Sequence, residues 1–143
     1  MRIHINIGSN IGDRMAHIGR AVALLARNIP DSRIYLSDYI ESEPWGFYSS
    51  NRFLNRGLLL ITRHNIAPHD ILYTTQRIER IIGYGAPHRH TDGSYRDRII
   101  DIDIIDIDNL TINTPQLTLP HPHAASRPFV LHPMQQLNHQ HPC

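Results

Sequence analysis

The sequence predicts an α+β fold: a ferredoxin-like sandwich with a mainly antiparallel sheet flanked by helices. Three observations predict it. First, segments whose apolar residues have a helical period alternate with segments whose apolar residues have a period of two. Second, glycine, proline or clusters of polar residues bound each segment. Third, a chain of 143 residues suits one domain. The expected order is strand, helix, strand, strand, helix, strand. Because this order serves many unrelated activities, function has to be argued from particular side chains.

The first two elements are a strand and a helix. Residues 2–7 alternate isoleucine with polar residues, which is typical of a half-buried strand. The tripeptide Gly-Ser-Asn at 8–10 ends it. From about residue 13 to residue 29 apolar residues recur every three or four positions, and Pro30 follows them. This pattern indicates an amphipathic helix.

Two strands and a second helix come next. Residues 33–42 and 52–63 alternate loosely and are separated by a polar loop, so we expect strands there. Pro68 suits the first turn of a helix, where its missing N–H costs nothing. Apolar residues then keep a helical period up to Gly83, a residue that favours helix ends.

The last third of the chain is more irregular. Residues 84–97 contain glycines and have no period, so we expect a loop with the composition of a mobile lid. Residues 99–107 read as a strand, followed by a turn and a short segment at 110–113. The histidine- and proline-rich end of the chain, residues 134–143, is expected to form a short, poorly ordered tail.

Composition narrows the class of protein. The one cysteine, Cys143, excludes an internal disulfide framework, and no apolar run approaches the roughly 18 residues of a membrane span. The first residues alternate instead of forming an apolar signal region, so the expected location is cytoplasmic. The net charge is +1 and all fourteen basic residues are arginine. We expect neither a nucleic-acid nor a membrane partner.

The acidic strand is the most informative segment. Asp101 and Asp103 are two apart, so they share one strand face with Cα atoms about 6.7 Å apart. Their mutual repulsion is about 3 kcal/mol at an effective dielectric near 20. A hydrated sheet surface would tolerate this, but a hard cation such as Mg²⁺ offsets it directly. Asp106 and Asp108 lie past a doubled isoleucine and are expected to be solvated near the turn.

Several motifs, taken together and in order, point to a family. They are Gly8-Ser9-Asn10, Glu43-Pro44-Trp45-Gly46-Phe47, Phe53-Leu54-Asn55, Gln76-Arg77-Ile78-Glu79, Arg98-Ile-Ile-Asp101-Ile-Asp103, Pro120-His121 and Arg127-Pro-Phe129-Val-Leu. In order and spacing these motifs resemble the 6-hydroxymethyl-7,8-dihydropterin pyrophosphokinase family. The resemblance runs from Ile3 to about Pro133. It implies that residues 1–143 form a single catalytic domain.

The resemblance implies a reaction and its cofactors. In this family the pterin hydroxyl attacks the β-phosphorus of ATP and AMP leaves, in folate biosynthesis. Such transfers depend on aligning the reactants and neutralising charge. ATP is therefore the expected co-substrate and hydroxymethyl dihydropterin the acceptor. Two Mg²⁺ ions are expected on Asp101 and Asp103, and the protein is expected to be a monomer.

The resemblance also implies site residues. Arg98, Asp101 and Asp103 are the expected catalytic residues. The expected ATP contacts are Leu72, Gln76, Arg98, Ile104, Leu117, Thr118, His121 and Arg127. The expected pterin contacts are Ser42, Pro44, Trp45, Phe53, Asn55, Tyr95 and Phe129. Without the resemblance, Leu72, Ile104 and the two phenylalanines read as core residues, His121 as a packed or surface histidine, and Asn55 as a polar residue on an outer strand face.

One departure from the family pattern affects the loop at 84–97. The family usually has arginine directly after the glycine that ends the second helix, but here Tyr84 follows Gly83. Arg89 is the expected lid cation, with Arg96 as the alternative. The altered loop keeps a second interpretation open, a non-catalytic relative that binds ATP and pterin without turnover. An RNA-binding module is disfavoured by the acidic strand and the lack of a basic face.

Overall fold

The structure is a computed structural model that describes residues 1–84, 89–92 and 96–143. Its elements, in order, are β1 (Arg2–Ser9), α1 (Arg14–Asn28), β2 (Ser32–Ser42), β3 (Phe53–Thr62), α2 (Pro68–Ile82), β4 (Asp101–Ile107), β5 (Ile112–Asn113), β6 (Thr118–Leu119), the 3₁₀ turn η1 (Ala124–Ser126) and α3 (Pro128–Gln140). One four-stranded sheet has the order β2-β3-β1-β4 with every neighbour antiparallel. The predicted α+β class and its antiparallel sheet are confirmed.

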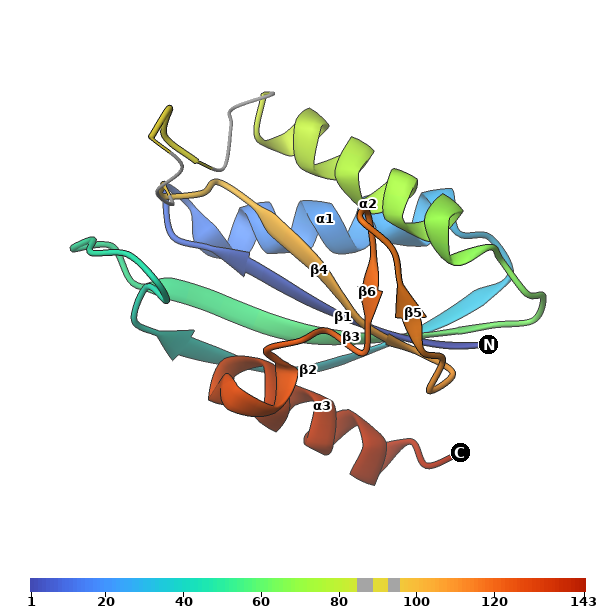
Figure 1. Cartoon of the computed structure of the whole chain (residues 1–143). Coiled ribbons are helices and arrows are strands. Elements are labelled where there is room, and N and C mark those ends of the chain that lie inside the picture. Colours follow the sequence, from blue (N-terminus) through green and yellow to red (C-terminus); the bar gives the residue numbers. More distant parts are fainter. Residues whose placement is uncertain (85–88, 93–95) are drawn as a thin grey trace.

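The sheet is the middle of three layers. Helices α1 and α2 pack together on one face, and α3 covers β2 and β3 on the other (Figure 1). The helix starts follow from sequence: Asp13 accepts a hydrogen bond from the Ala16 backbone N–H at 3.1 Å, and Pro68 opens α2. Among the described residues no helix has the length and apolar character needed to cross the bilayer.

Strand β1 separates two environments. Ile3, Ile5 and Ile7 are fully buried in the main hydrophobic core with α1 and α2. The residues between them face the other way, because successive strand side chains alternate. His4 and Asn6 therefore lie under α3, where both make hydrogen bonds to that helix. The apolar face of the strand stabilises the fold, and its polar face leads toward the site described below.

The C-terminal helix corrects one expectation. Residues 134–140, expected in a poorly ordered tail, form the second half of α3. Val130, Pro133 and Leu137 bury one side of this helix against the sheet. The approach is close at Gly57, where an added Cβ would lie 2.6 Å from Pro133 Cβ. Histidine and proline hid the helical period in the sequence, but burial of this apolar face stabilises the helix.

A second correction concerns Asp106, which was expected to be solvated. Only 7% of the residue is exposed. Its carboxylate accepts a hydrogen bond from the Asn109 backbone N–H at 3.3 Å, across the turn that follows β4. Asp108 is exposed as expected, and it accepts a 2.7 Å bond from the backbone N–H of Arg2. The turn residues thus anchor the start of β1.

Candidate active site

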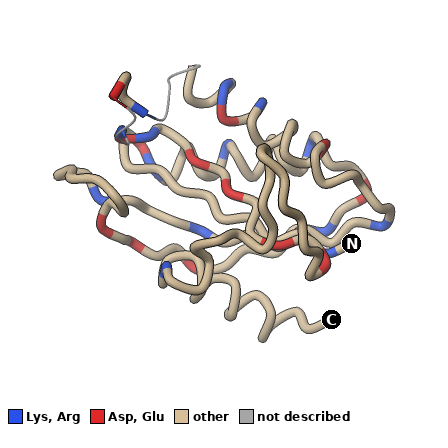
Figure 2. Tube along the Cα trace, in the orientation of Figure 1, with Lys and Arg blue, Asp and Glu red and all other residues tan. Residues whose placement is uncertain are grey.

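A cavity of about 390 Å³ opens beside β4 and contains most of the predicted site residues. Its lining comes from β1, β2, β3, α2, β4 and the segment leading into α3. Acidic positions follow one another along β4 (Figure 2). The lining residues are Asn6, Gly8, Ser42, Glu43, Trp45, Phe53, Asn55, Leu72, Gln76, Glu79, Arg89, Arg98, Asp101, Ile102, Asp103, His121, Pro122, His123, Arg127 and Phe129.

Four predicted contacts are not among the lining residues. Ile104 and Leu117 lie in the buried core, and Thr118 is exposed on β6. Pro44 is half-buried in the loop between β2 and β3. Tyr95 falls outside the described residues. All other predicted residues border the cavity, including Arg89.

The floor of the cavity is set by strand register. Gly8 on β1 pairs with Asn55 on β3 and with Asp101 on β4, so three neighbouring strands place these residues in one row. In the next row Asn6 pairs with Asp103. A Cβ added at position 8 would lie 3.1 Å from Asn55 Oδ1, a tight contact that Asn55 could relieve only by shifting. The missing side chain leaves space above the row.

The acidic side of the cavity is crowded with carboxylates. Arg98 forms a 2.7 Å ion pair with Asp101. Burial, and next the charge of Asp101, raise the pKa of Asp103 above its ordinary value, although Arg98 and Arg127 oppose the rise. Burial and then the charge of Asp101 also raise the pKa of Glu79, whose carboxylate accepts a 2.9 Å hydrogen bond from the Ile102 N–H. This end of the cavity favours an additional positive charge.

The donor set fits a magnesium ion bound together with a substrate. Among the described residues, no group of three or more histidine, cysteine, aspartate or glutamate side chains is arranged to hold a metal by itself. Magnesium is usually bound by one or two carboxylates, with waters and substrate phosphates completing its shell. Asp101 and Asp103, side by side on the cavity face of β4, offer that minimal set.

The opposite side of the cavity is aromatic and amide-lined. Asn55 is buried, not on an outer strand face. Its Nδ2 donates to the Ile40 carbonyl at 3.1 Å and to Ser42 Oγ at 2.9 Å. Because both bonds use the nitrogen, Oδ1 remains the atom nearest the open space above Gly8. The ring of Phe53 borders the same space. A flat ligand with a hydrogen-bond donor on its edge fits this side.

Two histidines, His121 and His123, also line the cavity. The backbone N–H of His123 donates to His121 Nδ1 at 3.2 Å, so Nε2 of His121 carries the proton when the ring is neutral. Burial, followed by the charges of Arg127 and His123, lowers the pKa of His121. His121 is therefore a neutral N–H donor at the cavity wall. Its own backbone N–H is fixed to the Ile105 carbonyl of β4 at 2.8 Å.

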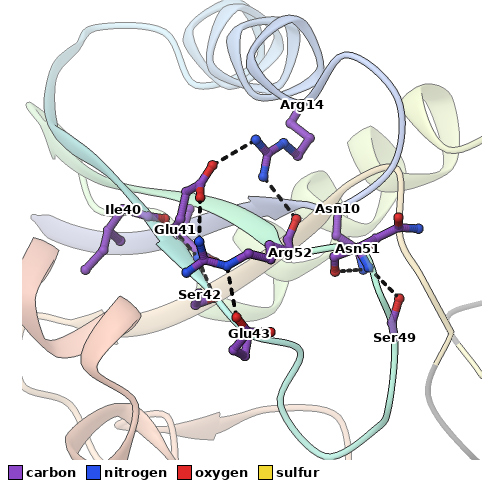
Figure 3. A network of polar contacts seen from close by, with 10 residues as sticks. Asn10, Arg14, Ile40, Glu41, Ser42, Glu43, Ser49, Asn51 and Arg52 are labelled. Carbon is purple, nitrogen blue, oxygen red and sulfur yellow. Dashed lines mark hydrogen bonds and ion pairs between the residues drawn. The ribbon is translucent and has the colours of Figure 1, made fainter.

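Polar contacts hold the loop between β2 and β3, as Figure 3 shows. Glu41 forms 2.9 Å ion pairs with both Arg14 and Arg52. On the other side of the loop, Asn10 donates to Asp97 Oδ1 at 2.8 Å and its Oδ1 accepts from the Arg98 N–H at 2.6 Å. Asn10, the last residue of the Gly-Ser-Asn motif at the end of β1, thus positions the backbone of the arginine that pairs with the acidic strand.

Several cavity residues had no predicted role, among them Glu79, Asn6 and His123. Glu79 lies three positions after Gln76 on α2, and this i, i+3 spacing was the signal available for it. Asn6 was one polar residue of an alternating strand, and His123 one of eleven histidines. Their contribution depends on strand pairing and on the path of the chain before α3, which local patterns do not contain.

Comparison with known proteins shows the family to which this chain belongs. The family model described as 7,8-dihydro-6-hydroxymethylpterin-pyrophosphokinase matches residues 4–139. A 2-amino-4-hydroxy-6-hydroxymethyldihydropteridine pyrophosphokinase of Porphyromonas gingivalis is 37% identical over 137 residues, covering 94% of this chain and 89% of the relative. The protein of the same name from Bacillus subtilis is 34% identical, covering 96% of this chain and 78% of the relative. The chain therefore belongs to the hydroxymethyldihydropterin pyrophosphokinase family, the ATP-dependent diphosphokinases that transfer pyrophosphate from ATP to hydroxymethyl dihydropterin in folate biosynthesis.

Proposed function

We propose that this chain carries out its family's transfer with Asp101 and Asp103 holding two magnesium ions and with the pterin lying against Asn55. The observation that best supports this proposal is that one cavity contains both the carboxylate pair of β4 and the amide and aromatic side chains of β3. Magnesium, when bound, would neutralise negative charge on the polyphosphate. The raised pKa of Asp103, caused first by burial and then by Asp101, supports a cation there.

The nucleotide is assigned to the side of the cavity formed by α2 and the segment before α3. Arg98, His121 and Arg127 border this space and would bind phosphate oxygens, two as permanent cations and His121 through its Nε2–H. Leu72 and Gln76 on α2 would lie beside the nucleotide. Ile104, Leu117 and Thr118 remain predicted adenine and ribose contacts, although they do not border the cavity in this structure.

The pterin is assigned to the β3 side. Asn55 Oδ1 would accept a hydrogen bond from the ring edge, and Ser42 would hold the amide through its 2.9 Å bond. Phe53 and Phe129 would stack on the ring faces, with Trp45 and Pro44 on the neighbouring loop. Tyr95 remains the predicted aromatic cover. Placing both substrates in one cavity aligns the hydroxyl with the polyphosphate, which lowers the barrier by proximity.

The lid, the oligomeric state and the compartment also belong to this proposal. Arg89 borders the cavity and would supply the cation that the loop lacks after Gly83. A monomer and a cytoplasmic location are proposed from the resemblance and from composition.

The test is release of AMP from ATP, measured with and without hydroxymethyl dihydropterin and with and without Mg²⁺. We expect AMP only when all components are present. Asp103→Asn should lower turnover by at least about a hundredfold, or about 2.7 kcal/mol of barrier. Asp38→Asn, at an exposed aspartate of β2 outside the cavity, is the matched control and should keep wild-type turnover.

Two outcomes would contradict the proposal. Full activity in Asp103→Asn would remove that residue from the metal site. Binding of ATP and pterin with no AMP release would identify the chain as a non-catalytic relative.

A further inference from the structure

A proline in α3 leaves one helix carbonyl without its usual partner. In an α-helix the carbonyl of residue i accepts from the N–H of residue i+4. For Phe129 that residue is Pro133, which has no N–H. Asn6 on β1 replaces it, because its Nδ2 donates to the Phe129 carbonyl at 3.1 Å. The sheet therefore completes the first turn of α3, the turn that carries the Phe129 ring into the active cavity.

The oxygen of the Asn6 amide shares its surroundings with a nitrogen of His4. Asn6 Oδ1 and His4 Nδ1 are both buried, and neither has a hydrogen-bond partner among the described residues. The two residues lie on the same face of β1, two positions apart. Both border a small cavity of about 10 Å³ between the sheet and α3. Its other lining residues are Ile5, Gly57, Ile105, Val130, Met134 and Leu137.

The hydrogen-bond roles at this cavity follow from Asn138 on α3. Its Oδ1 lies 3.2 Å from a guanidinium nitrogen of Arg2, which can only donate, and 3.0 Å from His4 Nε2. His4 Nε2 therefore carries a hydrogen, and Nδ1 of the neutral ring is an acceptor. Burial lowers the pKa of His4, which favours the neutral ring. The residues that line the small cavity thus include two buried acceptors, His4 Nδ1 and Asn6 Oδ1, among otherwise apolar side chains.

We propose that one water molecule binds in this cavity, donating one hydrogen to His4 Nδ1 and the other to Asn6 Oδ1, and that Asn6 is thereby a positioning residue for the Phe129 wall of the active cavity. The size suits a single water, which needs roughly 10–15 Å³. Two acceptors match its two hydrogens. The water keeps the oxygen of Asn6 toward His4 and the nitrogen toward Phe129. The positioning role rests on the proposed pterin site, whereas the water site does not.

The water site is tested by a crystal structure of the ligand-free protein at a resolution that shows ordered water. We expect a density peak within hydrogen-bond distance, about 2.7–3.2 Å, of both acceptor atoms. In His4→Phe one acceptor is lost, and the peak should disappear. A wild-type map with no peak at this position overturns the proposal.

The positioning role is tested by ligand binding. Asn6→Leu removes both polar atoms at similar volume, and we expect the pterin Kd, measured with a non-hydrolysable ATP analogue present, to rise about tenfold. The Kd of the ATP analogue alone should change less than about twofold. Ser37→Ala is the matched control, since Ser37 is a buried polar residue of the same sheet that bonds Gly57 and not α3. It should lower the melting temperature and leave both Kd values unchanged.

If Asn6→Leu raises the Kd of the pterin and the Kd of the ATP analogue equally, or changes neither, the positioning role is overturned and Asn6 is purely structural. His4→Phe keeps the Asn6–Phe129 bond and should raise the pterin Kd less than Asn6→Leu does; an unchanged Kd would overturn the contribution of the water. If wild-type protein binds no pterin, the proposed function fails, and the crystallographic result still decides the water site.

Discussion

The guanidinium carbon of Arg127 lies 4.0 Å from the centroid of the Trp45 ring. Arg127 precedes α3 and is assigned to the phosphates, whereas Trp45 follows β2 and is assigned to the pterin side. A cation–π contact of this kind contributes about 0.5–2 kcal/mol, more when it is shielded from water. His123 packs on the same indole, with ring centroids 4.9 Å apart. One stack of side chains therefore joins the two halves of the cavity.

This stack makes Trp45 a reporter of ligand binding, because it is the one tryptophan in the chain. We expect its fluorescence emission to change when pterin is added in the presence of a non-hydrolysable ATP analogue. In Asn55→Ala the pterin Kd from this titration should rise at least about tenfold, since an oriented buried acceptor is lost. The analogue Kd should stay within about twofold. Equal losses for both ligands would mean that the pterin lies elsewhere.

Arg89 is predicted to act in the transition state. It borders the cavity, and Tyr84 follows Gly83 at the position where the resemblance predicts arginine. A contact made mainly in the transition state lowers turnover when it is removed and affects ground-state binding little. Arg89→Ala should reduce kcat about tenfold, or about 1.4 kcal/mol, with an unchanged Kd for the ATP analogue. Arg63→Ala, at an exposed residue after β3, serves as the control. Wild-type kinetics in Arg89→Ala would transfer the role to Arg96 or to no residue.

His4 predicts a pH dependence of stability. Burial is the main cause of its lowered pKa; the charge of Arg2 lowers it further, whereas the Asn138 bond and Asp106 oppose the shift. The folded protein therefore binds a proton on His4 less readily than the unfolded chain. The stabilisation is fully present above the unfolded pKa, near 6.5, and is lost as the pH falls through the lower folded value.

The measurement is urea unfolding at pH 7.5 and at pH 5.5. Wild type should lose more unfolding free energy between these two values than His4→Phe, which has no titrating group at this position. A loss in His4→Phe as large as in wild type would assign the acid sensitivity to other residues.

The close approach of Gly57 to Pro133 predicts that two glycine-to-alanine variants change the stability of the protein in opposite directions. Gly57→Ala places a Cβ 2.6 Å from the proline ring and should destabilise the protein by about 1–3 kcal/mol through overpacking. Gly19→Ala lies on the exposed side of α1, where the added Cβ meets no other part of the protein within 4 Å, and should stabilise it by up to about 1 kcal/mol. Melting temperatures compare the two directly. A neutral Gly57→Ala would show that α3 can move away from β3 at little cost.

The limits of the sequence prediction are physical. Alternating isoleucines predicted β1, and Pro68 with Gly83 bounded α2, because those signals lie within each segment. Helix α3 was missed because its stability depends on Val130 and Leu137 packing on a sheet that is built elsewhere in the chain. Asp106 was read as solvated for the same reason: it is buried where β4 pairs with His4 of β1, a partner outside its own segment.

In the candidate site, too, some residues could be predicted from their own segment and others depend on tertiary structure. Asp101 and Asp103 were visible as an unusual pair of charges on one strand face. The resemblance supplied the other site residues, most of which border one cavity. Glu79, Asn6 and His123 border it as well, but their positions depend on register and chain path. Tyr95, the predicted aromatic cover, lies outside the described part of the chain.

The alternation of β1 has a consequence for how this protein tolerates change. Ile5 and Asn6 are neighbours in the chain, yet their side chains point into the apolar core and toward the cavity. A methylene removed from Ile5 would appear in a melting curve, whereas an altered amide at Asn6 would appear in a binding isotherm. Changes on the isoleucine face of this strand can therefore alter thermal tolerance without disturbing ligand recognition.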